Sequence, residues 1–256
     1  VQDILLKLLL MIRPYEVDPG ETDKVYLDSL DQMGKIVEQQ GLSNKERLRQ
    51  IKAGLRKVKE AFLAVQVNKE DRPLIGVVGE IFCRLNTFAN NELIRHIEAQ
   101  GGECWLTGIG EWVWYTNAEA FRRHREEKSR FTKPWLRTFI TGRLMRSDEK
   151  ILYKDFEEVF ADRPDPHVHE VLEAAQPYLP QSGALGEMVL STGGTITLYR
   201  RGVDGIVDIS PFSCMNGIVT EAVYPRVSKD HDNIPVRVFY FDGTQSDLDR
   251  DVGIFL

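Results

Sequence analysis

The chain has 256 residues, 42% hydrophobic and 28% charged, so it is long enough to bury a full core without disulfides or a structural metal. Lys and Arg number 33 against 39 Asp and Glu, giving a net charge of −6, which disfavours a protein that binds the phosphate backbone of nucleic acids. Three cysteines do not form the framework of a secreted disulfide-rich domain, and they predict a reducing, cytoplasmic location.

The longest apolar run, residues 4–12, is interrupted by Lys7 and is shorter than the roughly 20 residues that a membrane-spanning helix needs. Asp3 precedes it and Arg13 follows it, which excludes a signal peptide. No membrane partner is therefore predicted. The chain begins at Val1 and stops in apolar sequence, so we expect it to be a fragment of a longer protein.

Three helical patterns fill the first part of the chain. Apolar residues within 4–12 recur at helical spacing up to the breaker Pro14, and a second helix is predicted over residues 22–40. Ser43, with Glu46 three residues later, forms a capping box for a third helix. We expect these helices to form a helical arm or subdomain.

Beyond Pro73 the pattern changes to short apolar runs, typical of strands buried on both faces. The runs are residues 74–79, 103–107, 205–210 and 236–241. Helical patterns lie between them at residues 90–100, 186–201 and 218–229. This alternation predicts an α/β fold with a small, doubly wound, mainly parallel four-stranded sheet and helices on both faces.

A charged helical stretch over about residues 117–180 interrupts this alternation. Breaks are predicted at Pro134, near Ser147 and Asp148, and at residues 163–166. We expect a helical arm over residues 1–70 and an α/β domain over residues 71–256, with this stretch as a long helical insert.

Ligands of open α/β sheets collect where strands end and helices begin, since backbone N–H groups and helix dipoles converge there. Three polar segments reach that edge, residues 79–86, 210–217 and 242–246. Cys214 is the foremost candidate, because the start of a helix stabilises a thiolate, the form that binds iron or attacks electrophiles. The alternative is a small buried residue in a tight turn.

The other polar residues of these segments each have a functional and a structural interpretation. Cys83 shares the ambiguity of Cys214, whereas Cys104 lies within a strand and is expected to pack. Glu80 and Arg84 could bind a substrate carboxylate or amide, or pair with each other across a turn. The remaining substrate-binding candidates are Asn86 and Ser210, and Asn90 is predicted to cap the following helix.

Three further motifs match known sites only in part. The segment Ser191-Thr192-Gly193-Gly194 lacks the lysine of a phosphate loop, so we expect a helix break or a close packing point. His167 and His169 are expected to point apart. The basic run of residues 122–137, with nearby tryptophans, could bind the phosphates and adenine of coenzyme A or form a solvated helix face.

The chain resembles the 2-hydroxyacyl-CoA dehydratase family, specifically the C-terminal part of its large activase-related, dehydratase-like proteins. The resemblance extends over nearly the whole chain. It is carried by Arg13-Pro14-Tyr15-Glu16 with Pro19-Gly20, by Gly76-Val77-Val78-Gly79-Glu80-Ile81-Phe82-Cys83-Arg84-Leu85-Asn86 with Phe88-Ala89-Asn90, by Gly202-Val203-Asp204-Gly205-Ile206, and by Ser210-Pro211-Phe212-Ser213-Cys214-Met215.

This resemblance implies a dehydratase component that binds a 4Fe-4S cluster between two domains, receives an electron from an ATP-dependent activator protein and passes it to an acyl-CoA for reductive radical dehydration. Cys214 matches the family's Pro-Phe-x-Cys-Met segment and is the implied cluster ligand, with Cys83 ranked second. Asn216 stands where the family has Pro. A second dehydratase subunit is a further implied partner.

The three cysteines have none of the close spacings of a complete cluster site. We therefore expect the remaining ligands upstream of Val1, and a fragment that is inactive by itself. The alternative hypothesis is a noncatalytic module that docks an activator ATPase or a partner subunit through the arm and insert. A redox component predicts Cys214 exposed in a cleft beside Glu80 and Arg84, whereas a docking module predicts Cys214 buried and large apolar patches elsewhere.

Overall fold

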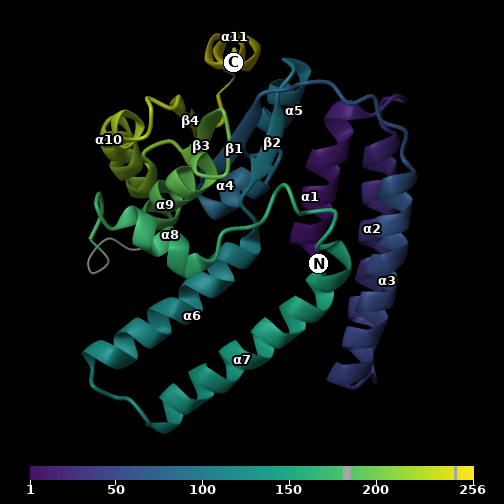
Figure 1. Cartoon of the computed structure of the whole chain (residues 1–256), viewed down its shortest axis with the longest axis vertical. Coiled ribbons are helices and arrows are strands. Elements are labelled where there is room, and N and C mark those ends of the chain that lie inside the picture. The colour runs from purple at the N-terminus through teal and green to yellow at the C-terminus, as the bar shows by residue number, and fades with distance from the viewer. Residues whose placement is uncertain (181–185, 245–246) are drawn as a thin grey trace. The chain divides into compact units, whose positions relative to one another are not determined.

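The structure is a computed structural model that describes residues 1–180, 186–244 and 247–256 (Figure 1). Its internal contacts divide the chain into two compact units. The helical unit consists of Val1–Glu70 and Trp112–Pro164, and the sheet unit consists of Asp71–Glu111 and Asp165–Leu256. The insert thus groups with the N-terminal helices. No described helix is both long and apolar enough to cross a membrane.

The N-terminal part of the helical unit contains α1 (Gln2–Ile12), the short 3₁₀ helix η1 (Arg13–Tyr15), α2 (Glu21–Glu38) and α3 (Asn44–Ala64). Ser43 Oγ accepts a hydrogen bond from the Glu46 N–H at 3.2 Å, which confirms the predicted cap of α3. Pro14 sits within η1 and ends the first helix as expected.

The insert forms α6 (Ile109–Glu126), α7 (Lys133–Tyr153) and η2 (Lys154–Phe156). The boundary between the two units falls within α6, which belongs to the helical unit from Trp112 onward. Pro134 lies in the first turn of α7, where its missing N–H needs no partner. The predicted break near Ser147 and Asp148 is wrong, because α7 continues through both. The local polar pattern there reflects only a solvated stretch of helix.

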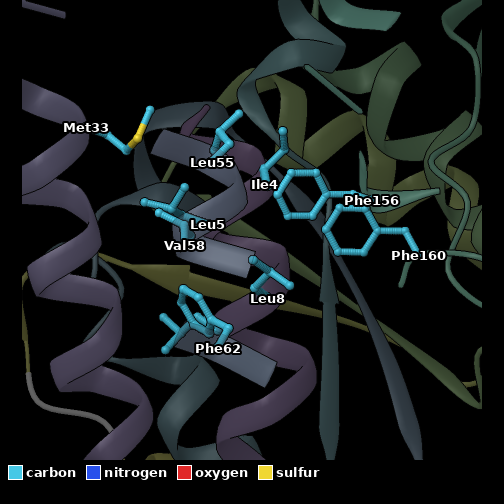
Figure 2. Close-up of a cluster of buried hydrophobic side chains, with 10 residues drawn as sticks. Ile4, Leu5, Leu8, Met33, Leu55, Val58, Phe62, Phe156 and Phe160 are labelled. Atoms are coloured by element: carbon cyan, nitrogen blue, oxygen red, sulfur yellow. The ribbon is translucent and has the colours of Figure 1, made fainter. Parts of the chain in front are cut away.

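A single apolar core joins the arm to the end of the insert (Figure 2). Phe156 and Phe160 stack with ring centroids 5.5 Å apart and pack among side chains of α1, α2 and α3. Asp155 adds an ion pair with Arg56 at 2.7 Å. The core residues are Ile4, Leu5, Leu8, Leu9, Met33, Leu55, Val58, Phe62, Phe156 and Phe160.

The sheet unit contains β1 (Leu74–Gly79), β2 (Glu103–Leu106), β3 (Gly205–Pro211) and β4 (Val236–Phe241). All three strand pairings are parallel, in the order β2-β1-β3-β4, which confirms the predicted α/β fold. From β1 the chain moves outward to β2 and later returns to β3 on the other side of β1. The strand order therefore reverses between β1 and β3.

Helices pack on both faces of this sheet. A Cβ added at Gly76 in β1 would lie 2.9 Å from Leu198 of α9 (Glu187–Tyr199). On the opposite face, a Cβ at Gly205 in β3 would lie 2.9 Å from Phe255 of α11 (Leu248–Phe255). The remaining helices of the unit are α4 (Ile81–Leu85), α5 (Leu93–Ala99), α8 (Val168–Ala175) and α10 (Met215–Asp230).

The segment 191–194 lies inside α9, which is continuous and buried along nearly its whole length. Its predicted role as a close packing point is confirmed at Gly193, where a Cβ would lie only 2.0 Å from the Val171 carbonyl oxygen of α8. His167 is the N-cap of α8 and accepts from the His169 N–H at 3.3 Å. The two imidazoles stack with centroids 5.2 Å apart, so the expectation that they point apart is wrong.

Candidate functional site

The carboxyl ends of β1 and β3 form the candidate site. Gly79 pairs with Ile209 in the sheet register, and the Glu80 N–H donates to the Ile209 carbonyl at 2.8 Å. The loops after these two strands therefore start side by side, at the point where the strand order reverses. Open α/β sheets bind ligands at such reversal points, because the following loops diverge and leave room between them.

Glu80 uses its carboxylate to cap α4. One oxygen accepts from the Phe82 N–H at 3.0 Å and the other from the Cys83 N–H at 2.7 Å. Both oxygens thus satisfy backbone groups that have no partner within the helix. Gly79 precedes this turn with φ +126°, and a Cβ there would lie 2.1 Å from the Ile209 carbonyl oxygen, so only glycine fits.

The Arg84 side chain is buried inside the protein and is therefore not available to bind a ligand at the surface. Its side chain is 3% exposed and pairs with Glu111 at 3.4 Å. It also donates to Thr107 Oγ1 and to the Gly108 carbonyl. The ion pair proposed between Glu80 and Arg84 is therefore replaced by a buried pair between Arg84 and Glu111, which links α4 to the start of α6.

The two asparagines organise the loop that follows α4. Asn86 Oδ1 accepts from the Ala89 N–H at 3.0 Å. Asn90 is buried and donates to the carbonyls of Cys83 at 2.8 Å and Arg84 at 3.3 Å. The prediction that Asn90 caps the following helix is wrong, because α5 begins after Glu92. Asn90 instead satisfies carbonyls at the end of α4.

Ser210, near the end of β3, is buried against the first turn of α10. A Cβ at Gly217 would lie 2.3 Å from Ser210 Oγ, so the glycine allows helix and strand to approach closely. Among the described residues, Ser210 Oγ has no hydrogen-bond partner.

The third predicted segment follows β4 and begins with an Asx turn, in which Asp242 accepts from the Thr244 N–H at 2.8 Å. Gln245 and Ser246 of this segment lie outside the described residues.

The two candidate thiols lie at this edge in different environments. Cys214 is the N-cap residue of α10 and is half-buried. Cys83 is buried in α4. Burial, the largest cause, and the negative charges of Glu80 and of a Cys214 thiolate together raise the pKa of the Cys83 thiol to about 11. Cys214 thus lies close enough for the charge of its thiolate to act on Cys83, whereas Cys104 is buried in β2.

A buried acid beside this edge was not singled out from the sequence. Asp208 of β3 accepts hydrogen bonds from Thr220 at 3.0 Å and from Tyr224, both on α10. Burial raises the pKa of Asp208, while these two hydroxyl donors and the charge of Arg84 act in the opposite direction. The signal was present, since Asp208 is a lone carboxylate within the apolar run of residues 206–209.

Exposed apolar side chains lie close in sequence to the two thiols. Phe82 follows Glu80, and Phe212 and Met215 flank Cys214 in sequence; all three are exposed. Phe212 contacts Tyr240 edge-on, with ring centroids 6.4 Å apart. Large apolar side chains that remain in solvent beside a polar edge are typical of a surface that another chain or domain covers.

The described residues do not complete a metal site. Across residues 1–180, 186–244 and 247–256, no group of three or more His, Cys, Asp or Glu side chains is arranged to hold a metal ion. A four-iron cluster is typically held by four thiolates. At most the two thiols of Cys83 and Cys214 could face one cluster at this edge, so the described chain alone does not fit a complete 4Fe-4S centre.

The basic run of the insert lies on α6 and α7 in the helical unit, whereas the candidate edge belongs to the sheet unit. Arg122 pairs with Glu119 and Glu126, and Arg123 pairs with Glu119 at 3.4 Å. These pairs belong to the solvated helix face that was one of the two interpretations.

Comparison of the chain with protein-family models, with curated proteins and with solved structures found no match.

Proposed function

We propose that this chain is a component of a dehydratase-like iron–sulfur protein and supplies Cys214 as one thiolate ligand of a cluster that ligands from outside residues 1–256 complete. The observation that carries the proposal is the position of Cys214, half-buried at the start of α10 and at the reversal point of the sheet. A thiol in this position is accessible and faces the positive end of a helix dipole.

The chain's own residues fix the position of this thiol. The Cys214 N–H donates to the Pro211 carbonyl at 3.1 Å, and its carbonyl accepts from the Ile218 N–H at 3.1 Å, so the backbone on both sides is held. Asn216 donates to Glu187 at 2.8 Å, tying α10 to α9. The exposed Phe82, Phe212 and Met215 would exclude water from the edge once it is covered.

The resemblance to the 2-hydroxyacyl-CoA dehydratases supports the finer part of the proposal. In this proposal the cluster, when bound, supplies one-electron transfer to an acyl-CoA, and an ATP-dependent activator protein delivers the electron. The buried Arg84 and the capping Glu80 have structural roles, so contacts to the acyl-CoA would come from other residues.

The test is anaerobic reconstitution of the full-length protein with iron and sulfide. Iron content and charge-transfer absorption are compared between the unmodified protein and Cys214→Ser, with Cys104→Ser as the matched control because Cys104 is buried within β2. We expect Cys214→Ser to lose the cluster and Cys104→Ser to retain it. Equal iron content in the unmodified protein and in Cys214→Ser, or no cluster in either, would refute the proposal.

A further inference from the structure

The hairpin of the helical unit, residues 112–153, carries a charge opposite to that of the whole chain. It contains ten Lys and Arg against five Asp and Glu, whereas the chain has a net charge of −6. Such a concentration of positive charge attracts acidic surfaces and repels basic ones. The hairpin consists of α6 from Trp112 onward and α7 (Figure 1).

One side of α7 is already used to hold the hairpin together. Trp114 Nε1 of α6 donates to Glu149 at 2.8 Å. A Cβ at Gly142 would lie 3.0 Å from the side-chain amide of Asn117 on α6, so this side of α7 faces α6. Because Gly142 and Glu149 are seven residues apart, they lie on the same side of α7.

The opposite side of α7 carries an apolar stripe in solvent. Leu136 is 49% exposed, Ile140 49%, Leu144 60% and Ile151 36%; Ile151 lies beside α3, where it lines a hollow with Leu48 and Lys52. Successive members are four, four and seven residues apart, which places them along one side of a helix. No residue of α7 is buried. We call these four residues the outer stripe.

Cationic residues border the outer stripe on both sides. Arg137 lies one position from Leu136, and Arg143 one position from Leu144, so they flank the stripe on opposite sides at about 100° per residue. Lys133, seven residues before Ile140, lies in line with it. No described ion pair involves Arg137, Arg143 or Lys133. Arg143 lies over the Phe139 ring at 5.9 Å.

We infer that the outer stripe of α7 docks an acidic, amphipathic helix of a partner protein. A narrow apolar stripe whose members are four or seven residues apart is a seam by which one helix packs on another, and the flanking charges select the partner. Here those charges are Arg137 and Arg143, which select Glu or Asp at the facing positions. A helix that lies on a lipid surface has a wider apolar face, so a membrane fits the outer stripe less well.

This inference does not rest on the proposed cluster. The outer stripe lies in the helical unit, whereas Cys214 lies in the sheet unit. The docking measurement gives the same result whether the protein binds a cluster, binds none, or loses it in Cys214→Ser.

The probe is a synthetic helical peptide of about three heptads with Leu at positions a and d and Glu at e and g. A second peptide replaces every Glu at e and g by Lys. Fluorescence anisotropy of each labelled peptide is measured against the complete chain at low and high salt. We expect the acidic peptide to bind, the basic peptide not to bind, and binding to weaken as salt screens the charges.

Variants of the chain locate the binding surface. Leu144→Asp and Ile140→Asp place a carboxylate in the outer stripe and are expected to weaken binding by about tenfold or more, because a charge is then desolvated at the seam. Leu27→Asp on α2 is the matched control, since Leu27 is 62% exposed outside the hairpin. Circular dichroism verifies that all three variants retain the helical content of the unmodified chain.

Each of five outcomes would overturn the inference, and the first four concern the peptides, the control variant and lipid. They are equal affinity for the acidic and basic peptides, no binding of either, a loss of affinity in Leu27→Asp as large as in Leu144→Asp, and Leu144-dependent binding to phosphatidylserine vesicles without binding to the peptide. Leu144-dependent dimerisation in sedimentation without peptide binding would assign the outer stripe to a second copy of the chain and likewise overturn it.

Discussion

Burial gives the two thiols at the sheet edge different reactivity. Cys83 is buried, and its pKa is raised from 9.0 to about 11, first by burial and then by nearby negative charge. Cys214 is half-buried at a helix start. Since the thiolate is the reactive form of cysteine, the raised pKa and the burial of Cys83 make it the less reactive of the two thiols at this edge.

Alkylation tests this difference. The raised pKa of Cys83 lowers its thiolate fraction at about pH 8 by about a hundredfold relative to an ordinary thiol. Its burial also limits access, so we expect iodoacetamide to modify the more accessible Cys214 at least about tenfold faster than Cys83. Peptide mass spectrometry follows both sites over time. Cys104, buried in β2, serves as an internal control that reacts only in urea. Equal rates at Cys83 and Cys214 in the native protein would contradict the structure.

Asp208 is the residue at which a pH dependence is expected. Burial raises its pKa in the folded state, so the folded chain holds this proton more tightly than the unfolded chain. The contribution of Asp208 to the free energy of unfolding is therefore largest below about pH 4, the ordinary pKa of Asp, and falls as the pH rises through the folded-state pKa.

Replacing Tyr224 by Phe removes one of the two hydroxyl donors to Asp208. We expect the free energy of unfolding to fall by about 1–3 kcal/mol at neutral pH. The loss should be smaller near pH 4, because a protonated carboxylic acid depends less on hydrogen-bond donors than a buried carboxylate does. Urea unfolding at both pH values measures this difference. Tyr178→Phe is the control, because Tyr178 bonds to Asp230 at the surface. A loss in Tyr224→Phe that is independent of pH would argue against an ionisable Asp208.

At the scale of the elements, the small residues of α9 allow helices and sheet to approach closely. Gly193 faces the backbone of α8, and Gly194 faces Val78 of β1, where a Cβ would lie 3.1 Å from a methyl carbon. Two buried threonines of α9 satisfy their hydroxyls within the helix, whereas Thr195 Oγ1 has no hydrogen-bond partner among the described residues. Thr192 donates to the Met188 carbonyl at 2.8 Å.

Gly193→Ala tests the contact between α8 and α9. Its Cβ would lie 2.0 Å from the Val171 carbonyl oxygen, so the helices must separate, and we expect a loss of about 1–3 kcal/mol or more in urea unfolding. Gly34→Ala on α2 is the matched control. A Cβ at Gly34 meets no atom within 4 Å, so the higher helix propensity of alanine should stabilise the chain by about 0.5–1 kcal/mol. Stabilisation by Gly193→Ala would disprove the close contact.

At the scale of the whole molecule, each unit has its own core. The helical unit combines Val1–Glu70 with Trp112–Pro164, and Phe156 is fully buried where these segments meet. The core of the sheet unit includes Leu198 and Ile206. Units with separate cores can unfold in separate steps, so a single unfolding transition is not expected.

Phe156→Ala is expected to destabilise the helical unit by about 3–5 kcal/mol, because it leaves a cavity between α1, α3 and the end of the insert. Hydrogen exchange should then accelerate in α1, α2 and α3, while the amides of β1 and β3 keep their protection. Phe88→Ala is the control, as Phe88 is exposed. Equal acceleration in both units would show that they unfold together.

The sequence by itself determined the elements and the fold class. The strands 74–79 and 236–241 have the predicted bounds, and the Ser43 cap forms as expected, because period and capping depend on neighbours along the chain. It also placed Cys83 and Cys214 in the segments that follow the first and third strands. Local patterns failed at two places. Asn90 bonds to the carbonyls of Cys83 and Arg84 instead of capping the next helix, and the polar residues near Ser147 lie on a solvated face of a continuous helix.

Only the tertiary structure decided which segments meet. The order β2-β1-β3-β4 brings the loops of Cys83 and Cys214 together, the donors from α10 surround Asp208, and Phe156 joins the insert to the N-terminal helices. Arg84 pairs with Glu111 rather than Glu80. These contacts join residues far apart in the chain, and periodicity specifies which face of an element is apolar without specifying which element will cover it.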